Sequence, residues 1–196
     1  DAAYYETIHA GKQQNVAADF RVKKYRLDFS MGLNLTGSAK VYVDRSELKS
    51  YRFTLYHGYK VKQVTDQTGA ALDFRREHDY VTVTRGEAAV EYLCLEYTGK
   101  SPKYYSSYAG VCLPANFAYY PIPGYRELFK DSFYGFIDCS LPYDTAFDVR
   151  CSGRKQMYCN LAARGDNHFA GNARSITLLS GYYDILKLNA TLVVYP

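Results

Sequence analysis

The sequence contains no tryptophan and only two methionines, and no apolar run in it approaches the length of a membrane helix, about 18 to 20 residues. A basic segment followed by an apolar core, which would mark a signal peptide, is absent from its first residues. We therefore expect a chain that is soluble as given and does not itself span a membrane.

An excess of positive charge is also lacking. Lysine and arginine together number 24 against 20 acidic residues, the net charge is +4, and the basic residues are spread along the chain. Proteins that bind nucleic acids concentrate basic side chains on one face or stripe. We therefore expect no nucleic-acid partner.

Cysteines are few, and their spacing does not form a metal-binding pattern. The five residues are Cys94, Cys112, Cys139, Cys151 and Cys159. The lack of any C-x-x-C pair excludes a zinc ribbon and a thioredoxin motif, and the odd number leaves at least one free thiol in a monomer. A disulfide between the last two is compatible with their spacing but is not predicted.

Catalytic signatures are equally scarce. The four histidines, His9, His57, His78 and His168, each lack a second ligand at helical or hairpin spacing, so we predict no metal site and interpret His57 and His78 as loop residues without a special role. No nucleophile-elbow motif is present. A catalytic triad needs only neighbours in space, so an independent hydrolase stays open as one hypothesis.

Tyrosine, in contrast, is abundant, with 22 copies, and hydrophobic residues make up 47% of the chain. Tyrosine is typical of strands and of half-wet surfaces, where the ring is buried and the hydroxyl reaches water. A β-rich fold explains this composition. The alternative is a tyrosine-rich surface that stacks on a glycan or a peptide.

Alternating apolar and polar residues predict many short strands. Tyr25, Leu27 and Phe29 alternate with charged residues and would share one buried face of a strand. The predicted strands cover residues 23–29, 39–43, 51–55, 59–64, 72–74, 80–84, 90–97, 133–139, 147–151, 156–161, 175–179, 182–188 and 191–194. Three further features lie between or within these strands. A phase irregularity within 59–64 predicts a bulge, and residues 66–69 predict a turn. The glycine- and asparagine-rich stretch 165–172 is interpreted as a loop.

These patterns predict an all-β fold, an antiparallel β-sandwich. An irregular segment rich in aromatic residues and proline, residues 104–125, would cross it, and at most one short helix would follow at 126–130. We expect a lead-in segment at residues 1–21 and a single β-sandwich domain at residues 22–196.

Three stretches together resemble a known family. They are Tyr25-Arg-Leu-Asp-Phe29, Leu33-Asn-Leu-Thr-Gly-Ser-Ala-Lys-Val41 and Leu93-Cys-Leu-Glu-Tyr-Thr-Gly99. With the order of elements over residues 22–196, they resemble the N-terminal β-sandwich domain of the M1 zinc metallopeptidases, the family of leukotriene A4 hydrolase-like and aminopeptidase N-like enzymes.

The resemblance implies an accessory domain that leads into a catalytic domain, in which a His-Glu-x-x-His helix and a downstream glutamate bind zinc. Those elements do not occur in this sequence. The resemblance therefore implies a non-catalytic fragment without a cofactor of its own, with zinc expected only in a following catalytic domain. That domain, C-terminal in the same parent chain, is the expected partner, and a peptide is a further one.

The resemblance also implies a substrate-side segment at residues 113–121. The family often presents a glutamine or glutamate just before this segment, but residues 98–126 contain neither, and Asn116 is their only side-chain amide. The substrate-side candidates are Tyr108, Asn116, Tyr119 and Tyr120. For Tyr119 and Tyr120 the alternative is that they anchor the crossing segment on the sandwich.

The motif Tyr119-Tyr120-Pro121 resembles a variant found in bacterial relatives, some of which are anchored in a membrane. This resemblance implies an extracytoplasmic, cell-surface location for the domain of such a parent. Two other functions stay open beside the scaffold role: a free-standing extracellular β-sandwich that binds a glycan or peptide through tyrosines, and the independent hydrolase.

Overall fold

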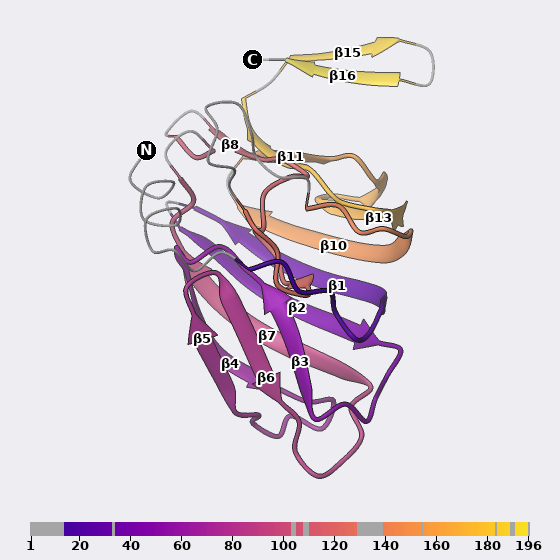
Figure 1. Cartoon of the computed structure of the whole chain (residues 1–196). Helices are drawn as coiled ribbons and strands as arrows, with labels where there is room; N and C mark the ends of the chain where they lie inside the picture. The colour runs from indigo at the N-terminus through magenta and orange to yellow at the C-terminus, as the bar shows by residue number, and fades with distance from the viewer. Residues whose placement is uncertain are drawn as a thin grey trace.

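The computed structural model describes residues 14–32, 34–102, 105–107, 110–128, 139–153, 155–182, 184–188 and 191–195, the last two ranges as backbone only. Within these ranges every regular element is a strand, and the strands form sheets of seven, four, three and two strands (Figure 1). The predicted all-β fold is confirmed. A search of the described residues for helices able to cross a bilayer finds none.

The seven-stranded sheet has the order β12-β13-β10-β1-β2-β7-β4, and the four-stranded sheet has the order β5-β6-β3-β9. In chain order the strands are β1 (Val22–Met31), β2 (Leu35–Val43), β3 (Ser50–Thr54), β4 (Tyr59–Thr65), β5 (Phe74–Glu77), β6 (Tyr80–Thr84), β7 (Tyr92–Gly99), β8 (Gly110–Leu113), β9 (Ile122–Pro123), β10 (Thr145–Gly153), β11 (Gln156–Cys159), β12 (Ala162–Gly165), β13 (His168–Ala173), β14 (Leu178–Gly181), β15 (Asp184–Leu188) and β16 (Thr191–Tyr195).

The two larger sheets share one hydrophobic core. Leu27 of β1 and Leu93 of β7 belong to the same buried cluster as Phe53 of β3 and Val83 of β6, which lie in the other sheet. Phe20, which precedes β1, adds an edge-on contact to Phe53 with the ring centroids 5.4 Å apart. Burial of one face of each sheet against the other is what defines a sandwich.

Strand β1 lies in the middle of the large sheet. Its apolar residues Tyr25, Leu27 and Phe29 are at most 2% exposed, as the alternation predicts. It pairs antiparallel with β2 and parallel with β10, whereas the other strand pairs described are antiparallel. A period-two pattern reports which face is buried and carries no information about the direction of the neighbouring strand.

The predicted bulge and turn are both confirmed. The register of β4 against β7 shifts between Val61 and Gln63. In the following turn, Asp66 Oδ1 accepts hydrogen bonds from the Thr68 amide at 2.8 Å, the Thr68 hydroxyl at 2.7 Å and the Ala70 amide at 3.1 Å. These bonds lower the pKa of Asp66, the Thr68 side chain contributing most, and Gly69 takes a φ of 86°.

The interpretation of residues 165–172 as a loop is wrong, because β12 and β13 form a hairpin there that extends the large sheet beside β10. The residues of β12 are solvent-exposed and most of those of β13 are partly exposed, and nearly all are small or polar, so the sequence of the hairpin shows no apolar alternation. Asn167 adopts a φ of 52° in its turn, a left-handed conformation that asparagine tolerates.

Other boundaries differ less or cannot be compared. The strand predicted at 175–179 is β14, three residues further along, and the strand predicted at 72–74 is β5, which begins at Phe74. Residues 126–128 are not helical, and both 129–130 and most of the strand predicted at 133–139 lie outside the described residues. The division into a lead-in segment at 1–21 and one domain at 22–196 stays a prediction.

The contact between β7 and the turn before β4 leaves no room for a side chain at Gly99. A Cβ atom built there would lie 1.9 Å from the carbonyl oxygen of Gly58, which is a backbone atom. We expect Gly99→Ala to lower the free energy of unfolding by about 1–3 kcal/mol, because the two backbones must separate. Urea denaturation measures this change.

Gly86→Ala is the matched control. Its Cβ atom would meet only Leu72 Cδ2, at 3.7 Å, so its stability should stay within about 0.5 kcal/mol of the unsubstituted chain. Equal destabilisation by the two substitutions would contradict the close backbone contact.

Candidate functional site

The aromatic segment connects two sheets. It leaves the three-stranded sheet at the end of β8, which pairs with β14, and enters the four-stranded sheet at β9, which pairs with β3. Residues 114–121 between these strands form no regular element. Of the irregular segment predicted at residues 104–125, the part at 114–121 is confirmed as irregular, and we call it the crossing segment from here on, whereas Gly110–Leu113 and Ile122–Pro123 within the predicted range form the strands β8 and β9.

Tyr119 and Tyr120 lie in the core and have no exposed surface. The Tyr119 hydroxyl donates to the Ile176 carbonyl at 2.8 Å, and the Tyr120 ring packs edge-on against Tyr25 with centroids 5.4 Å apart. Burial raises the pKa of Tyr119 well above its usual range, so its hydroxyl keeps its proton as a donor. The two rings anchor the crossing segment, and a substrate-side role for them stays a prediction.

Two further hydroxyl groups hold this segment from the large sheet. Tyr97 of β7 donates to the Tyr119 carbonyl at 2.9 Å, and Tyr25 of β1 donates to the Pro121 carbonyl at 2.8 Å. Both donors are buried, and burial raises the pKa of each well above its usual range. Carbonyl groups that an irregular buried segment would otherwise leave unpaired are thus satisfied by tyrosine side chains.

The other two substrate-side candidates are placed differently. Asn116 is partly exposed, in the stretch between β8 and the buried Phe117. Tyr108 lies outside the described residues. Among the predicted substrate-side residues that the structure describes, Asn116 is therefore the one with an exposed surface.

A hollow of about 740 Å³ lies beside the lead-in residues, next to the end of the crossing segment. Its charged lining consists of Arg21, Arg126 and Glu127, and Phe20 and Tyr143 contribute aromatic surface. The Arg126 guanidinium donates to the Ser140 carbonyl at 2.8 Å, which ties one side of the hollow to the chain before β10. Both signs of charge line it, so it shows no preference for one class of ligand.

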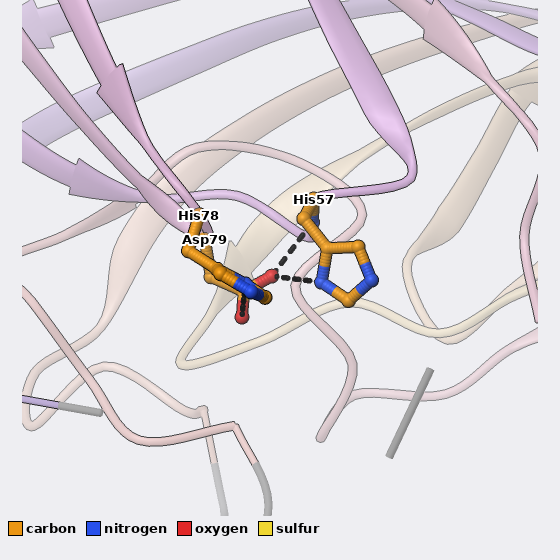
Figure 2. A group of neighbouring side chains, drawn as sticks. All are labelled: His57, His78 and Asp79. Carbon is orange, nitrogen blue, oxygen red and sulfur yellow. Dashed lines mark hydrogen bonds and ion pairs between the residues drawn. The ribbon is translucent and has the colours of Figure 1, made fainter. Parts of the chain in front are cut away.

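A second cluster of polar side chains joins His57, His78 and Asp79 (Figure 2). His57 follows β3 in the turn that leads to β4, and His78 and Asp79 form the turn between β5 and β6. His57 Nδ1 lies 2.9 Å from Asp79 Oδ1, and His78 Nδ1 lies 3.6 Å from Asp79 Oδ2. The potential ligand atoms of the three residues lie within 4.8 Å of one another, which makes them a candidate metal-binding set.

Backbone and guanidinium contacts hold this cluster in place. Asp79 is 3% exposed, and its Oδ1 also accepts the backbone amide of His57 at 2.6 Å. Arg76 donates to the carbonyls of Leu55 at 2.7 Å, Tyr56 at 2.9 Å and His78 at 2.6 Å. Burial lowers the pKa of Arg76 to about 10, against the opposing effect of Asp79, so the guanidinium stays charged at neutral pH.

The sequence interpretation missed this cluster. His57 and Asp79 are 22 residues apart and lie in different turns, and the register of β3 against β6, which pairs Thr54 with Tyr80, brings the turns together. A signal was available in His57-Gly58 and His78-Asp79, which both stand at the ends of predicted strands. To predict from these positions that the side chains meet, one would have to know that β3 pairs with β6.

The cysteines do not resemble activated nucleophiles. Cys151 and Cys159 are both free, so the disulfide between them that their spacing permits is not formed. Burial raises the pKa of Cys151 to about 12 and that of Cys159 to about 11, whereas a reactive cysteine has a lowered pKa. Both are neutral thiols at physiological pH, which weakens a Cys-His version of the hydrolase hypothesis.

Comparisons with solved structures identify relatives of this fold, although no protein-family model and no curated protein matches the sequence. Leukotriene A4 hydrolase from Saccharomyces cerevisiae superposes with a TM-score of 0.60 at 10% identity, over 94% of this chain and 33% of that one. An M1 zinc metallopeptidase from Deinococcus radiodurans, bound to a Tyr-Ser-Ala substrate, gives 0.55 at 14% identity over 89% and 46%. An aminopeptidase N family protein from Idiomarina loihiensis gives 0.55 at 7% identity over 86% and 31%.

The chain has the fold of the N-terminal domain region of M1 metallopeptidases. The resemblance noted in the sequence is confirmed at this level. The chain spans between about a third and a half of the length of the structures it matches. At these identities the comparison reports the fold, and the activity of the matched enzymes does not follow from it.

The buried hydroxyl of Tyr97 provides a test of how the crossing segment is held. We expect Tyr97→Phe to lower the free energy of unfolding by about 1–2 kcal/mol, because the buried Tyr119 carbonyl loses its donor. Urea denaturation followed by circular dichroism measures the change. Tyr182→Phe is the control, since Tyr182 is 82% exposed, and a Tyr97→Phe stability equal to that of the control would contradict the anchoring role.

Proposed function

We propose that this chain is a non-catalytic N-terminal scaffold domain of an M1-like zinc aminopeptidase or of a degenerate relative. The observation that carries the proposal is the asymmetry of the structural matches. They cover 89% and 94% of this chain but only 46% and 33% of the metallopeptidase and hydrolase chains. In the proposal, the uncovered part of such a parent supplies the chemistry.

The absence of a His-Glu-x-x-His motif from the sequence supports a non-catalytic role. In zinc peptidases this motif places two histidine ligands and a general-base glutamate on one helical face. The proposal therefore assigns the catalytic zinc and peptide hydrolysis to a catalytic domain that follows in the same parent chain. This chain contributes no cofactor to that reaction and serves as a wall beside the substrate.

In the proposal, the crossing segment at residues 114–121 forms that wall. Buried Tyr119 and Tyr120 fix the segment from beneath, and Asn116 remains partly exposed. An asparagine amide can both donate to and accept from the backbone of an extended peptide. Because residues 98–126 lack glutamine and glutamate, the parent would recognise the free amine of a substrate differently from typical family members or would have lost the activity.

The proposal places the domain on the extracytoplasmic side of a membrane-anchored bacterial parent. The support is the resemblance of Tyr119-Tyr120-Pro121 to the variant of such relatives. Labelling of intact cells with an impermeant reagent would separate a cell-surface location from a cytoplasmic one.

The alternative of a free-standing module that binds glycans or peptides through tyrosines has less support. Tyr182 is the one exposed tyrosine among those whose side chains the structure describes, whereas Tyr51, Tyr59 and Tyr97 are among the largest fully buried side chains. A stacking platform needs several exposed rings on one face. The abundance of tyrosine is accounted for by the core.

The scaffold role predicts a specific kinetic effect in the full-length parent. For a parent that has kept peptidase activity, we expect aminoacyl-coumarin substrates to be hydrolysed by the parent and not by the 196-residue chain. Asn116→Ala in the parent should raise KM about 5- to 10-fold and leave kcat within about twofold, the result of removing one or two hydrogen bonds to the substrate ground state.

Gln63→Ala is the control, because Gln63 is an exposed amide on β4, outside the crossing segment. Turnover by the isolated chain would overturn the non-catalytic assignment in favour of the independent hydrolase. A parent without a zinc-binding motif, combined with binding of a glycan or peptide by this chain alone, would favour the free-standing module.

A further inference from the structure

We propose that His57, His78 and Asp79 bind a divalent transition-metal ion, with Zn²⁺ as the representative of the class. The site would lie within this domain and would be separate from the zinc expected in a catalytic domain. The proposal does not depend on the scaffold function, because it rests on side chains of this chain alone (Figure 2).

The spacing of the three side chains suits such an ion. A tetrahedral zinc ion with ligand bonds of about 2.0–2.2 Å separates its ligand atoms by about 3.3–3.6 Å. The two nitrogen-to-carboxylate distances are 2.9 Å and 3.6 Å, and the ligand atoms all lie within 4.8 Å of one another. Small side-chain rotations would bring them onto one coordination sphere.

His78 supplies an independent reason to expect a ligand. Its Nδ1 atom is buried and has no hydrogen-bond partner, although nearly all buried polar atoms in proteins are paired. Its backbone φ of 55° is the conformation that the two-residue turn between β5 and β6 requires, and this turn holds the ring beside Asp79. A metal ion bound through the Nδ1 lone pair would provide the missing partner.

The surroundings hold the other two ligands in place before an ion arrives. Asp79 accepts the His57 amide at 2.6 Å, and the ring of Tyr56 lies 4.5 Å from that of His57. Binding of an ion through Nδ1 of His57 requires the neutral tautomer that carries its proton on Nε2. Outer contacts of this kind orient metal ligands and are a regular part of metal sites.

The charge of Arg76 sets a limit on the affinity. Its guanidinium is anchored beside the cluster by three carbonyl groups, and its positive charge opposes that of a metal ion, whereas the Asp79 carboxylate favours it. We therefore expect weaker binding than in a four-ligand structural zinc site.

The chemistry of the donors selects the class of ion. Two imidazoles with one carboxylate suit Zn²⁺ and other late first-row ions, whereas Mg²⁺ and Ca²⁺ prefer oxygen ligands throughout. Three protein ligands also leave a coordination position for water.

The ion would join two turns of the four-stranded sheet region. The loop that carries His57 also contacts the crossing segment, since the Tyr56 amide donates to the Ala118 carbonyl at 2.9 Å. The proposed role is therefore to fix the turn between β3 and β4 against the turn between β5 and β6, beside the segment assigned to the substrate-side wall.

Titration calorimetry of the tag-free chain, stripped with EDTA, tests the proposal. We expect one Zn²⁺ per chain, no binding of Mg²⁺, and a rise in Tm when Zn²⁺ is added. His78→Asn should weaken the Zn²⁺ affinity by at least about 10-fold and remove the rise in Tm, while the turn survives because asparagine tolerates a positive φ.

His168→Gln is the matched control. His168 and Asp148 form another His–Asp pair, with Nε2 and Oδ1 2.9 Å apart, but no second histidine joins them in the clusters found among the described residues. The control should bind Zn²⁺ like the unsubstituted chain. Absence of saturable binding to the unsubstituted chain, or equal affinities of that chain and His78→Asn, would overturn the proposal and leave a hydrogen-bonded cluster without a metal.

Discussion

The burial of polar backbone in an irregular segment is the constraint on which this sandwich depends. Residues 114–121 cross between two sheets without the ladder of hydrogen bonds that a strand would have. Tyr25 and Tyr97 reach them from the large sheet, and Tyr119 reaches outward to Ile176. Each ring fills core volume while its hydroxyl donates to a carbonyl group. Phenylalanine would fill the same volume but would leave the carbonyl group without a donor. Tyr25, Tyr97 and Tyr119, three of the 22 tyrosines, meet this requirement for a ring with a donor.

Sequence reasoning located the elements well where one face of a strand is buried and the other is wet. β1, β2, β3 and β6 carry that alternation, and their positions were predicted within a few residues. It failed at β12 and β13, because a hairpin of alanine, glycine and asparagine at the edge of a sheet has little apolar pattern. There the partner strand β10, and not the local sequence, determines the conformation.

The site was harder to predict for a related reason. The path of the aromatic segment could be inferred from its prolines and rings, but the burial of Tyr119 and Tyr120 depends on which sheets the segment joins. His57 and His78 looked unremarkable because each was judged by its chain neighbours. Strand pairing is a long-range property, and a cluster assembled from two turns becomes visible only after the register of β3 and β6 is known.

The parallel pairing of β1 with β10 has a consequence for how the chain folds. The Thr145 hydroxyl of β10 donates a hydrogen bond to the carbonyl of Val22 of β1, 123 residues away in the sequence. The rings of Tyr25 and Phe147 stack with centroids 5.0 Å apart. During synthesis β1 and β2 can pair early, but the other edge of β1 must wait until more than half of the chain has left the ribosome. An open edge of this kind is a template for incorrect pairing. We therefore expect the pairing of β10 with β1, in the middle of the large sheet, to be the slow step in the folding of this domain, and not the pairing of strands at the edges of the sheet.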